Sequence, residues 1–339
     1  MWLNTTWFVL YVVIIGGYVI LDGFDLGVGI LSPFVARDDR ERRLVLNSIG
    51  PVWDGNEVWL VLGGGALFAA FPLVYASLFS GFYLAMMLVL LVLILRTVAV
   101  EFRSQRDSTR WRSTFDWFFF GSSLGITVLL GVALGNVIRG LPIDQQGNMN
   151  VDLVGLLNPY SLALGVTGVV MLSLHGGIFL TIKTEDEIQD RVRHAVPWLM
   201  AAFFVLMTVL IGWTLLLDTP ITDNYGDRLW IAVFPVLALL AALAAWRSIH
   251  HDRYLQAFGT SSLMIGLLMA AVAAGLYPIL LHSSTDPAYD LTITNAASAE
   301  PTLRVMLVIA IIGMPFVLLY TAGVYYFFRG KVVLDEESY

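Results

Sequence analysis

Long apolar stretches alternate with short polar connections along almost the whole chain. A bilayer core about 30 Å thick is crossed by a helix of roughly 20 apolar residues, which is the length of most of these stretches. The second stretch opens with Asp54 and Glu57, and Pro72 is predicted to separate it from the third in a tight helical hairpin. The pattern predicts nine membrane-spanning helices, over residues 7–31, 53–72, 74–98, 116–138, 159–182, 195–217, 229–247, 257–281 and 304–328.

Basic residues between these stretches are distributed very unequally. Fifteen Lys and Arg residues lie in the connections that follow the first, third, fifth and seventh stretches or in the C-terminal tail. Only Arg139, Arg228 and Arg304 lie in the other connections. Because cytoplasmic loops carry the excess of Lys and Arg, the N-terminus is predicted outside and the C-terminus in the cytoplasm. Arg96 is the one basic residue inside a predicted span.

Composition agrees with a membrane protein. The 339 residues are 58% hydrophobic and 13% charged, whereas soluble domains carry about 25% charged residues. The fold is therefore predicted to be an all-α integral membrane protein, with residues 1–339 forming a single transmembrane domain. Residues 1–140 are expected to form a first four-helix bundle, 155–281 a second, and 303–328 one additional peripheral helix. The longest external connection, 282–301, is expected to be an ordered or flexible cap.

Several kinds of chemistry find no support in the sequence. There is no cysteine, which excludes disulfides and thiolate metal sites, and there is no GxxxxGK[ST] or HExxH motif. Nothing indicates a nucleic acid partner. His175 is the only histidine inside a predicted span, and we expect it to be a hydrogen-bonded packing residue beside Gly176 and Gly177. A single-haem cytochrome that uses His175 as its ligand is a weaker alternative.

Two carboxylates in the first span are the stronger functional candidates. An Asp at mid-bilayer costs about 2.5–3.5 kcal/mol on insertion scales, so Asp22 and Asp25 are expected to face the bundle interior. They are spaced to lie on one helical face, about 13 Å and 9 Å from the end of a span that stops at Leu31. The neighbouring glycines predict that another helix approaches closely, at Gly23, Gly27 and Gly29.

A second polar group opens the second span. Asp54 and Glu57 have the spacing of a capping box, so a structural role and a proton role are both open for Asp54. Trp53 and Trp59 are expected to anchor the helix at the interface. Arg96 is interpreted as the counter-charge to a carboxylate of span 1 or 2, with snorkelling to the interface as the alternative.

All these ionisable residues lie toward the predicted cytoplasmic side of the first four spans, together with Glu101 and Asp116. Spans 5 to 9 carry no Asp, Glu, Lys or Arg at mid-depth, which counts against a proton-coupled secondary transporter, the alternative function. The one-sided set instead indicates proton delivery from the cytoplasm to a reaction centre, which would have to lie on a partner.

Several motifs resemble subunit II of the cytochrome bd-type quinol oxidases. They are densest over residues 16–120, and similar segments continue to Leu319-Tyr-Thr-Ala322 in the last span. The resemblance is carried by Asp22-Gly-Phe-Asp-Leu-Gly-Val-Gly29, Arg40-Glu-Arg-Arg43, Pro51-Val-Trp-Asp-Gly-Asn-Glu-Val-Trp-Leu60, Gly64-Gly-Ala-Leu-Phe-Ala-Ala-Phe-Pro72 and Leu157-Asn-Pro159.

The resemblance implies a subunit of a heterodimer in the bacterial cytoplasmic (inner) membrane that reduces O2 to water with electrons from quinol. It implies that haems b and d and the quinol substrate are bound by a partner, subunit I, and that this chain supplies no haem ligand. A structural quinone and a small accessory single-span subunit are possible further components, with membrane lipid around them.

The resemblance also places a cytoplasmic proton path at Asp25, Asp54 and the neighbouring Trp53. Asp22, Glu57 and Arg96 are included as residues beside that path. Glu57 stands where other family members carry Gln, so this chain has one more acidic group beside Asp54.

Overall fold

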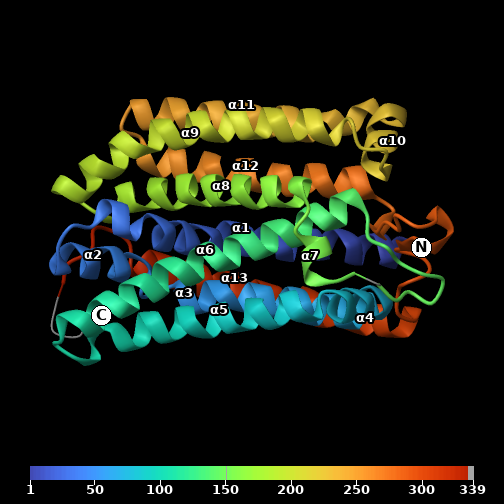
Figure 1. Ribbon diagram of the computed structural model, residues 1–339, viewed down its shortest axis with the longest axis horizontal. Coiled ribbons are helices and arrows are strands. Elements are labelled where there is room, and N and C mark those ends of the chain that lie inside the picture. The colour runs from blue at the N-terminus through green and yellow to red at the C-terminus, as the bar shows by residue number, and fades with distance from the viewer. Residues whose placement is uncertain (150, 335–339) are drawn as a thin grey trace.

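The computed structural model describes residues 1–149 and 151–334, and most of them belong to long helices aligned with one axis of the molecule (Figure 1). The N-terminal half consists of α1 (Trp2–Val35), α2 (Asp39–Ile49), α3 (Trp53–Ala70), α4 (Pro72–Gly81), α5 (Tyr83–Phe102), the 3-10 turn η1 (Arg103–Gln105) and α6 (Thr109–Arg139). The C-terminal half consists of α7 (Leu153–Leu156), α8 (Pro159–Lys183), α9 (Asp186–Thr214), α10 (Pro220–Asp227), η2 (Leu229–Ala232), α11 (Val233–His250), α12 (Tyr254–Leu276), β1 (Ile279–Leu281), η3 (Pro287–Tyr289), β2 (Leu291–Thr292) and α13 (Glu300–Phe327).

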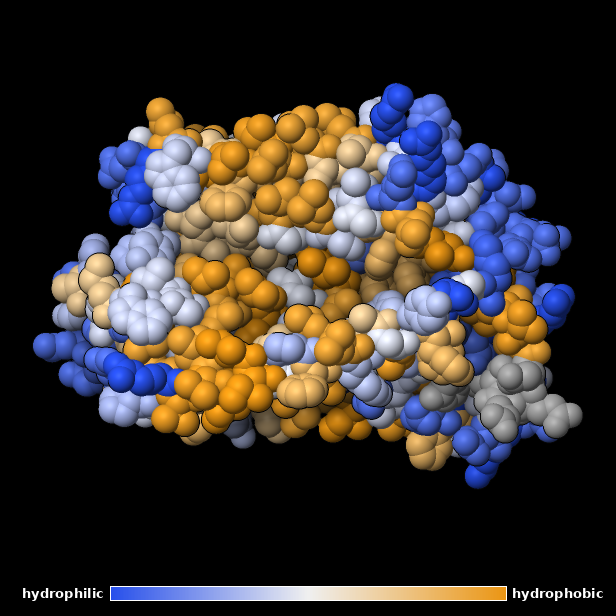
Figure 2. Space-filling view, turned by 180° about the vertical axis from the view of Figure 1, so that it is seen from behind, coloured by the Kyte–Doolittle hydropathy of each residue, from blue (hydrophilic) through white to orange (hydrophobic). Residues whose placement is uncertain are grey.

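Eight of these helices, among the described residues, are long and apolar enough to cross a membrane. They are α1, α5, α6, α8, α9, α11, α12 and α13. Figure 2 shows apolar residues over the middle of one face and hydrophilic residues gathered toward both ends. Because such an apolar girdle matches lipid and the ends match water, the chain is a multi-pass membrane protein.

The second predicted span, α3, is not among the eight helices. Asp54 and Asn56 in its first turn, with Glu57 directly after it, lower its hydropathy. It nevertheless runs antiparallel to the apolar part of α1, since Asn56 touches Asp25 and Gly63 lies against Ile15. The number of spans thus depends on whether α3 is counted, and nine remains a prediction.

Two predicted helix limits were wrong. Residues 74–98 do not form one span, because a bend at Phe82 separates α4, which begins at Pro72, from α5, which begins at Tyr83. The stretch 257–281 is helical only as far as Leu276, and Ile279–Leu281 instead pairs antiparallel with Leu291–Thr292. Hydropathy alone does not distinguish an apolar strand from a helix end, which explains the second error.

The predicted cap between α12 and α13 is ordered and tied to the helix ends. Leu141, directly after α6, donates its N–H to the His282 carbonyl, and Ser298 donates its N–H to the Ala70 carbonyl. The Asn4 amide donates to the Ile293 carbonyl at 2.6 Å. The cap therefore joins α1, α3 and α6 at the end of the molecule that carries the N-terminus (Figure 1).

Helix α1 is the central element of the fold. It packs against α3 and α6 on one side and against α8 and α12 on the other. α13 packs mainly against α1 and α3, and it is the least covered of the long helices in the described part of the chain. This packing gives α1 the interior position that its two carboxylates require.

Candidate functional site

The α1 and α8 backbones meet at a pair of glycines. A Cβ added at Gly27 would lie 1.8 Å from the Leu172 carbonyl oxygen, and one added at Gly176 would lie 2.5 Å from Gly27. Only residues without a side chain permit this contact, which confirms the predicted close approach of another helix. The contact lies one turn or less from Asp25 and His175, so the α8 backbone packs directly against this part of α1.

Asp22 forms a two-point ion pair with Arg96 of α5. The guanidinium Nη1 donates to Oδ2 at 2.9 Å and Nη2 donates to Oδ1 at 2.6 Å. Neither side chain is exposed. The sequence-based interpretation of Arg96 as a counter-charge is therefore confirmed, and snorkelling is not what the guanidinium does. Parallel N–H···O bonds of this kind hold both groups in one geometry.

Asp25, one turn further along α1, faces α3 instead. Its Oδ2 accepts a hydrogen bond from the Asn56 side-chain amide at 2.7 Å. The Asn56 carbonyl oxygen in turn accepts from the Tyr325 hydroxyl of α13 at 2.9 Å. The Asp25 Oδ1 is buried and has no hydrogen-bond partner among the described residues. A buried carboxyl oxygen without a partner is costly unless it is protonated or hydrated, which sets Asp25 apart from Asp22.

Glu57 and Asp54 lie between this buried group and the surface of the chain. Glu57 Oε2 is 3.8 Å from Arg96 Nη1, and the Glu57 side chain is 18% exposed. Asp54 is exposed, one helical turn earlier on the same helix. The acidic residues of α3 thus lead from an exposed carboxylate toward the buried Asp22–Arg96 pair.

The capping interpretation of Asp54 was wrong. α3 begins at Trp53, its N-cap is Val52, and no side chain caps it. Asp54 therefore lies inside the first turn and not at the cap position, because the helix starts two residues earlier than the capping-box spacing requires. Trp53 is 4% exposed and belongs to the core and not to an interfacial belt.

Helix α1 extends beyond its predicted end. It continues to Val35, which places Asp25 about 15 Å and Asp22 about 20 Å from the helix end at 1.5 Å per residue. Both carboxylates are thus deeper than a helix ending at Leu31 would put them.

His175 has no free ring nitrogen. Its Nδ1 lies 2.8 Å from the Ser261 hydroxyl and its Nε2 lies 3.1 Å from the Ile20 carbonyl oxygen. The ring stacks on Phe258 with a centroid distance of 4.8 Å and an interplanar angle of 5°. This confirms the prediction of a hydrogen-bonded packing residue. Among residues 1–149 and 151–334, no three His, Asp or Glu side chains gather as a metal site would need.

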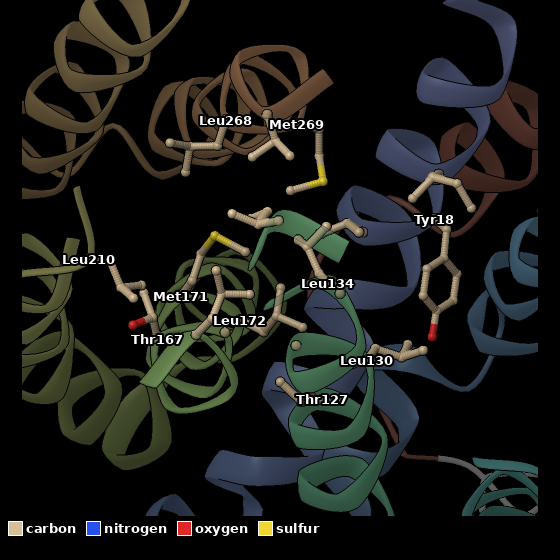
Figure 3. Close-up of a pocket in the computed structure, with 18 of the residues that line it drawn as sticks. Tyr18, Thr127, Leu130, Leu134, Thr167, Met171, Leu172, Leu210, Leu268 and Met269 are labelled. Carbon is tan, nitrogen blue, oxygen red and sulfur yellow. The ribbon is translucent and has the colours of Figure 1, made fainter. Parts of the chain in front are cut away.

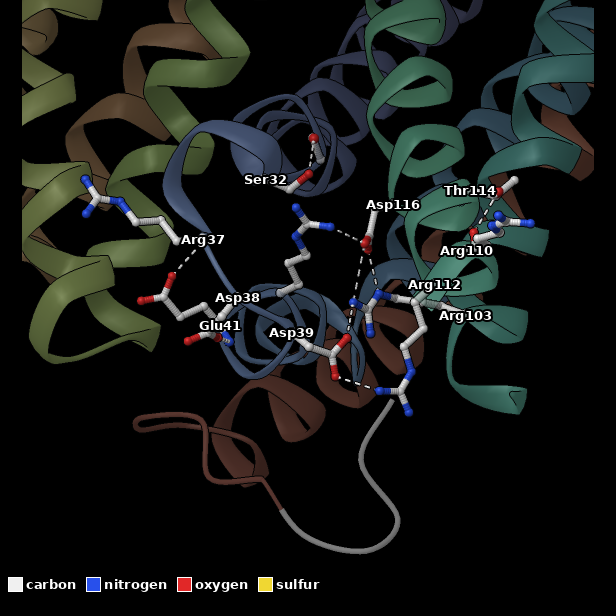
Figure 4. A network of polar contacts seen from close by, with 12 residues as sticks. Ser32, Arg37, Asp38, Asp39, Glu41, Arg103, Arg110, Arg112, Thr114 and Asp116 are labelled. Carbon is white, nitrogen blue, oxygen red and sulfur yellow. Dashed lines mark hydrogen bonds and ion pairs between the residues drawn. The ribbon is translucent and has the colours of Figure 1, made fainter. Parts of the chain in front are cut away.

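A second polar network fixes α2 to the start of α6 (Figure 4). Arg103 bridges Asp116 at 2.6 Å and Asp39 at 2.9 Å. Arg112 also pairs with Asp39 at 2.9 Å, and Arg42 pairs with Asp116 at 2.8 Å. These ion pairs hold α2 against η1 and the start of α6.

Glu41 anchors α2 on the side of α9, where it forms an ion pair with Arg191. Burial alone would raise the pKa of the Glu41 carboxyl. The bond from Arg191 and the backbone N–H of Arg37 outweigh burial and hold its pKa below the usual value.

An apolar cavity of about 860 Å³ lies between the two halves of the chain (Figure 3). Its walls come from α1, α3 to α6 and α8 to α12. The labelled lining includes Leu130, Leu134, Met171, Leu172, Leu268 and Met269. Its size and its apolar walls suit a hydrophobic ligand.

Sequence reasoning found Asp22, Asp25, Glu57 and Arg96, which the structure brings together, but it missed Asn56 and Tyr325. Asn56 could have been found as a polar residue inside a predicted span, between Asp54 and Glu57. Tyr325 carries no such signal, because one more aromatic residue near the end of a span is ordinary.

Comparisons with known proteins agree with this arrangement. Residues 3–328 match the family described as cytochrome bd terminal oxidase subunit II. The chain is 36% identical over 335 residues to the cytochrome bd ubiquinol oxidase subunit 2 of Bacillus subtilis, a match that covers 98% of each chain. It is 34% identical to the cytochrome bd-I ubiquinol oxidase subunit 2 of Escherichia coli K12, over 98% of this chain and 96% of the relative.

The fold has a solved counterpart. A chain in the structure of bd oxidase from Geobacillus thermodenitrificans superposes with a TM-score of 0.81, over 97% of this chain and 99% of that one, at 18% identity. At that identity the likeness concerns the fold alone. The family match and the two full-length relatives settle the classification: the chain belongs to the cytochrome bd terminal oxidase subunit II family, and so to the subunits of respiratory bd-type oxidases.

Proposed function

We propose that this chain is the haem-free subunit of a quinol:O2 oxidoreductase in a bacterial cytoplasmic membrane. It binds and stabilises a haem-bearing subunit I, on which quinol is oxidised and O2 is reduced to water. The haems b and d of that partner supply the redox chemistry. This chain's own contribution is to hold the partner in place and to move protons toward it from the cytoplasmic side.

The engagement of His175 supports a haem-free role. Both ring nitrogens already have partners within the chain, and the ring is stacked on Phe258. Ligation of an iron would require breaking one of these bonds and turning a buried ring. The alternative of a single-haem cytochrome built on His175 is therefore not favoured.

The observation that carries the proton role is the separation of the two α1 carboxylates. Asp22 is held by two bonds from Arg96, whose guanidinium stays protonated, so this pair acts as a fixed charge beside the path. Asp25 makes one bond to Asn56 and leaves one oxygen available. Asp25 is thus the carrier in this proposal, and Asp22 is a positioning residue.

The acidic residues of α3 supply the entry to the path. Asp54 is exposed and Glu57 is one turn further in, at the spacing at which two side chains of a helix are neighbours. Protons pass between such carboxylates through bridging water. Trp53, packed in the core beside them, fixes the first turn of α3 and so the direction in which Asp54 points.

The test uses conservative substitutions in the affinity-purified complex. We expect Asp25→Asn and Asp54→Asn to lower quinol oxidase turnover at least tenfold while haem content and absorption spectrum are unchanged. Asp218→Asn, an exposed carboxylate in the connection before α10, should keep full turnover. Normal turnover in both site variants would overturn the path, and loss of haem in either would make that residue structural.

The same purification tests the partnership. A haem-containing larger subunit should accompany the tagged chain in native lipid. Recovery of a stable haem-free homo-oligomer that couples proton movement to uptake of a solute would instead favour a secondary transporter.

We further propose that the apolar cavity holds the isoprenoid tail of a structural quinone. Its walls are mostly aliphatic and aromatic, with scattered Tyr and Thr hydroxyls, and long apolar tails gain free energy by leaving water or filling such voids. Leu134→Trp would fill part of the cavity, and we expect quinone extracted from the complex to fall below one per complex. Leu134→Met keeps the volume and should retain it; equal quinone in both would refute the site.

A further inference from the structure

A second cavity, of about 480 Å³, lies beside the first turns of α6 at the end of the bundle that carries α2. It is lined by Arg106, Ser108, Arg110, Trp111, Thr114, Phe115 and Phe118. The part of the cavity lined by Arg106, Ser108 and Arg110 is therefore cationic and carries a hydroxyl group. The rest is mostly aromatic. None of these residues belongs to the proton path proposed above.

The two arginines of this cavity differ from their neighbours. Arg42, Arg103 and Arg112 are all held by Asp39, Asp107 or Asp116. Arg106 and Arg110 are exposed and make no ion pair among the described residues. Asp107, which lies between them in the sequence, pairs with Arg112 at 2.7 Å. The cavity thus keeps two positive charges that no ion pair within residues 1–149 and 151–334 neutralises.

The cavity is also built in a fixed shape. The Trp111 indole N–H donates to the Phe102 carbonyl at 2.8 Å, which sets the ring, and the Arg106 guanidinium lies over that ring at 4.5 Å. Stacking on an aromatic face holds a guanidinium in place while leaving its N–H groups free to donate. The Ser108 side chain makes no capping bond, so its hydroxyl is available as well.

The different depths of the cavity's residues in the membrane indicate the chemistry of its ligand. Phe118 lies eight residues after Arg110 on the same helix, or about 12 Å deeper at 1.5 Å per residue. Its side chain is 40% exposed and is part of the apolar surface. A ligand that fills this cavity therefore needs an anionic head at the arginines and an apolar body alongside Phe115 and Phe118.

We infer that this cavity is a binding site for one anionic phospholipid, with its phosphodiester at Arg106, Arg110 and Ser108 and an acyl chain along Phe118. Two guanidinium groups donate to phosphate oxygens in the geometry that arginine favours. The site lies on the side where the positive-inside rule predicts the cytoplasmic leaflet, which is the leaflet rich in anionic lipids.

Native mass spectrometry of the delipidated complex, titrated with phosphatidylglycerol or phosphatidylcholine, tests the site. We expect the first phosphatidylglycerol to bind preferentially, and Arg106→Gln with Arg110→Gln to weaken it about 30-fold, since each basic residue near an anionic headgroup contributes roughly 1 kcal/mol. Phosphatidylcholine binding should not change. Inorganic phosphate at millimolar concentration should not displace the lipid.

The matched control removes the same charge elsewhere on this side. Arg37→Gln with Arg40→Gln affects two exposed arginines outside the cavity, and phosphatidylglycerol affinity should change less than about threefold. Equal weakening in both double variants would overturn the site in favour of general surface attraction, and displacement by phosphate would make it a free-anion site. If the glutamine variant misfolds, Arg106→Lys with Arg110→Lys replaces it as the test. This variant keeps both charges, so it should keep the preference for the anionic lipid, and loss of that preference at normal melting temperature would overturn the site.

Discussion

Asp22 and Asp25 lie one helical turn apart on α1, yet their carboxylates meet different helices. Asp22 receives two bonds from Arg96 of α5, and Asp25 receives one from Asn56 of α3. At the residue scale, this difference in partners gives one carboxylate a fixed charge and the other an unused oxygen. Two aspartates of the same motif therefore have separable roles, which substitution can distinguish.

The Asp22–Arg96 pair should respond to substitution as a buried ion pair. Arg96→Gln leaves Asp22 buried without its cation, and breaking a buried pair in this way costs about 3–5 kcal/mol. We expect a lower melting temperature and a lower yield of the complex. The double variant Asp22→Asn with Arg96→Gln should recover much of the loss, as a double-mutant cycle would measure. Additive losses would show that the two residues do not depend on one another.

The sequence predicted most of these site residues for a physical reason. Charged groups inside an apolar run are so costly that they stand out, as Asp22, Asp25 and Arg96 do. Their pairing could be proposed because only one cation lies inside a span. Tyr325 could not be found, since its hydrogen bond to Asn56 depends on how α13 packs and not on any local pattern. The span start at residue 53 was predicted, but the capping role given to Asp54 was wrong, because Asp54 lies inside the first turn.

At the scale of elements, the contact of α1 with α8 decides how deeply the site is buried. Gly27→Ala would place a methyl group 1.8 Å from the Leu172 carbonyl oxygen, so two backbones would have to separate. We expect destabilisation at the upper end of the about 1–3 kcal/mol that overpacking costs, seen as a lower melting temperature. Gly64→Ala on α3 meets nothing within 4 Å and is the control. A normal melting temperature for Gly27→Ala would contradict the close approach.

Helix α2 should loosen in acid because of Glu41. A carboxyl whose pKa is lowered by folding stabilises the fold above its ordinary pKa of about 4.3, and this contribution is lost as the pH falls through the lowered value. The pair with Arg191 is partly exposed, so it contributes about 1 kcal/mol or less. Hydrogen exchange of α2 in Glu41→Gln should therefore be up to about fivefold faster than in the wild type at pH 7.

The acid limit provides the check on that prediction. At pH values below the lowered pKa of Glu41 the wild-type carboxyl is protonated, so the wild type and Glu41→Gln should exchange at the same rate. Exchange measured side by side at each pH removes the intrinsic pH dependence of the amides. A difference that persists in acid would mean that Glu41 holds α2 by packing and not by charge.

Element boundaries were predicted well where apolar runs are long and end in charge. α8 was expected over 159–182 and is found at Pro159–Lys183, because Pro159 starts it and Lys183 ends it. The bend at Phe82 and the strand at Ile279–Leu281 were not predicted. Both lie in continuous apolar sequence, where the tertiary packing of the external cap, and not local composition, decides between helix and strand.

At the scale of the whole molecule, the exposed side of α3 is unusual for a lipid-facing surface. Val58, Val61, Gly65 and Phe68 follow Asp54 at helical spacing, and all five are exposed. A carboxylate on a face bathed in lipid would be costly, whereas a partner subunit could supply it with hydrogen-bond donors. The same stripe is apolar beyond Asp54, which suits packing against another membrane helix.

This stripe predicts where the haem-bearing partner docks. Because this chain has no cysteine, a single introduced cysteine is its only thiol. Val61→Cys, which replaces a side chain that is 72% exposed, should become crosslinked to the partner by a photoactivatable thiol reagent in the native membrane. Leu240→Cys on α11, a helix that Figure 1 places away from α3, is 55% exposed and should crosslink only to lipid. Partner crosslinks from Leu240 and none from Val61 would move the interface to the other half of the chain and leave Asp54 without a route to the haems.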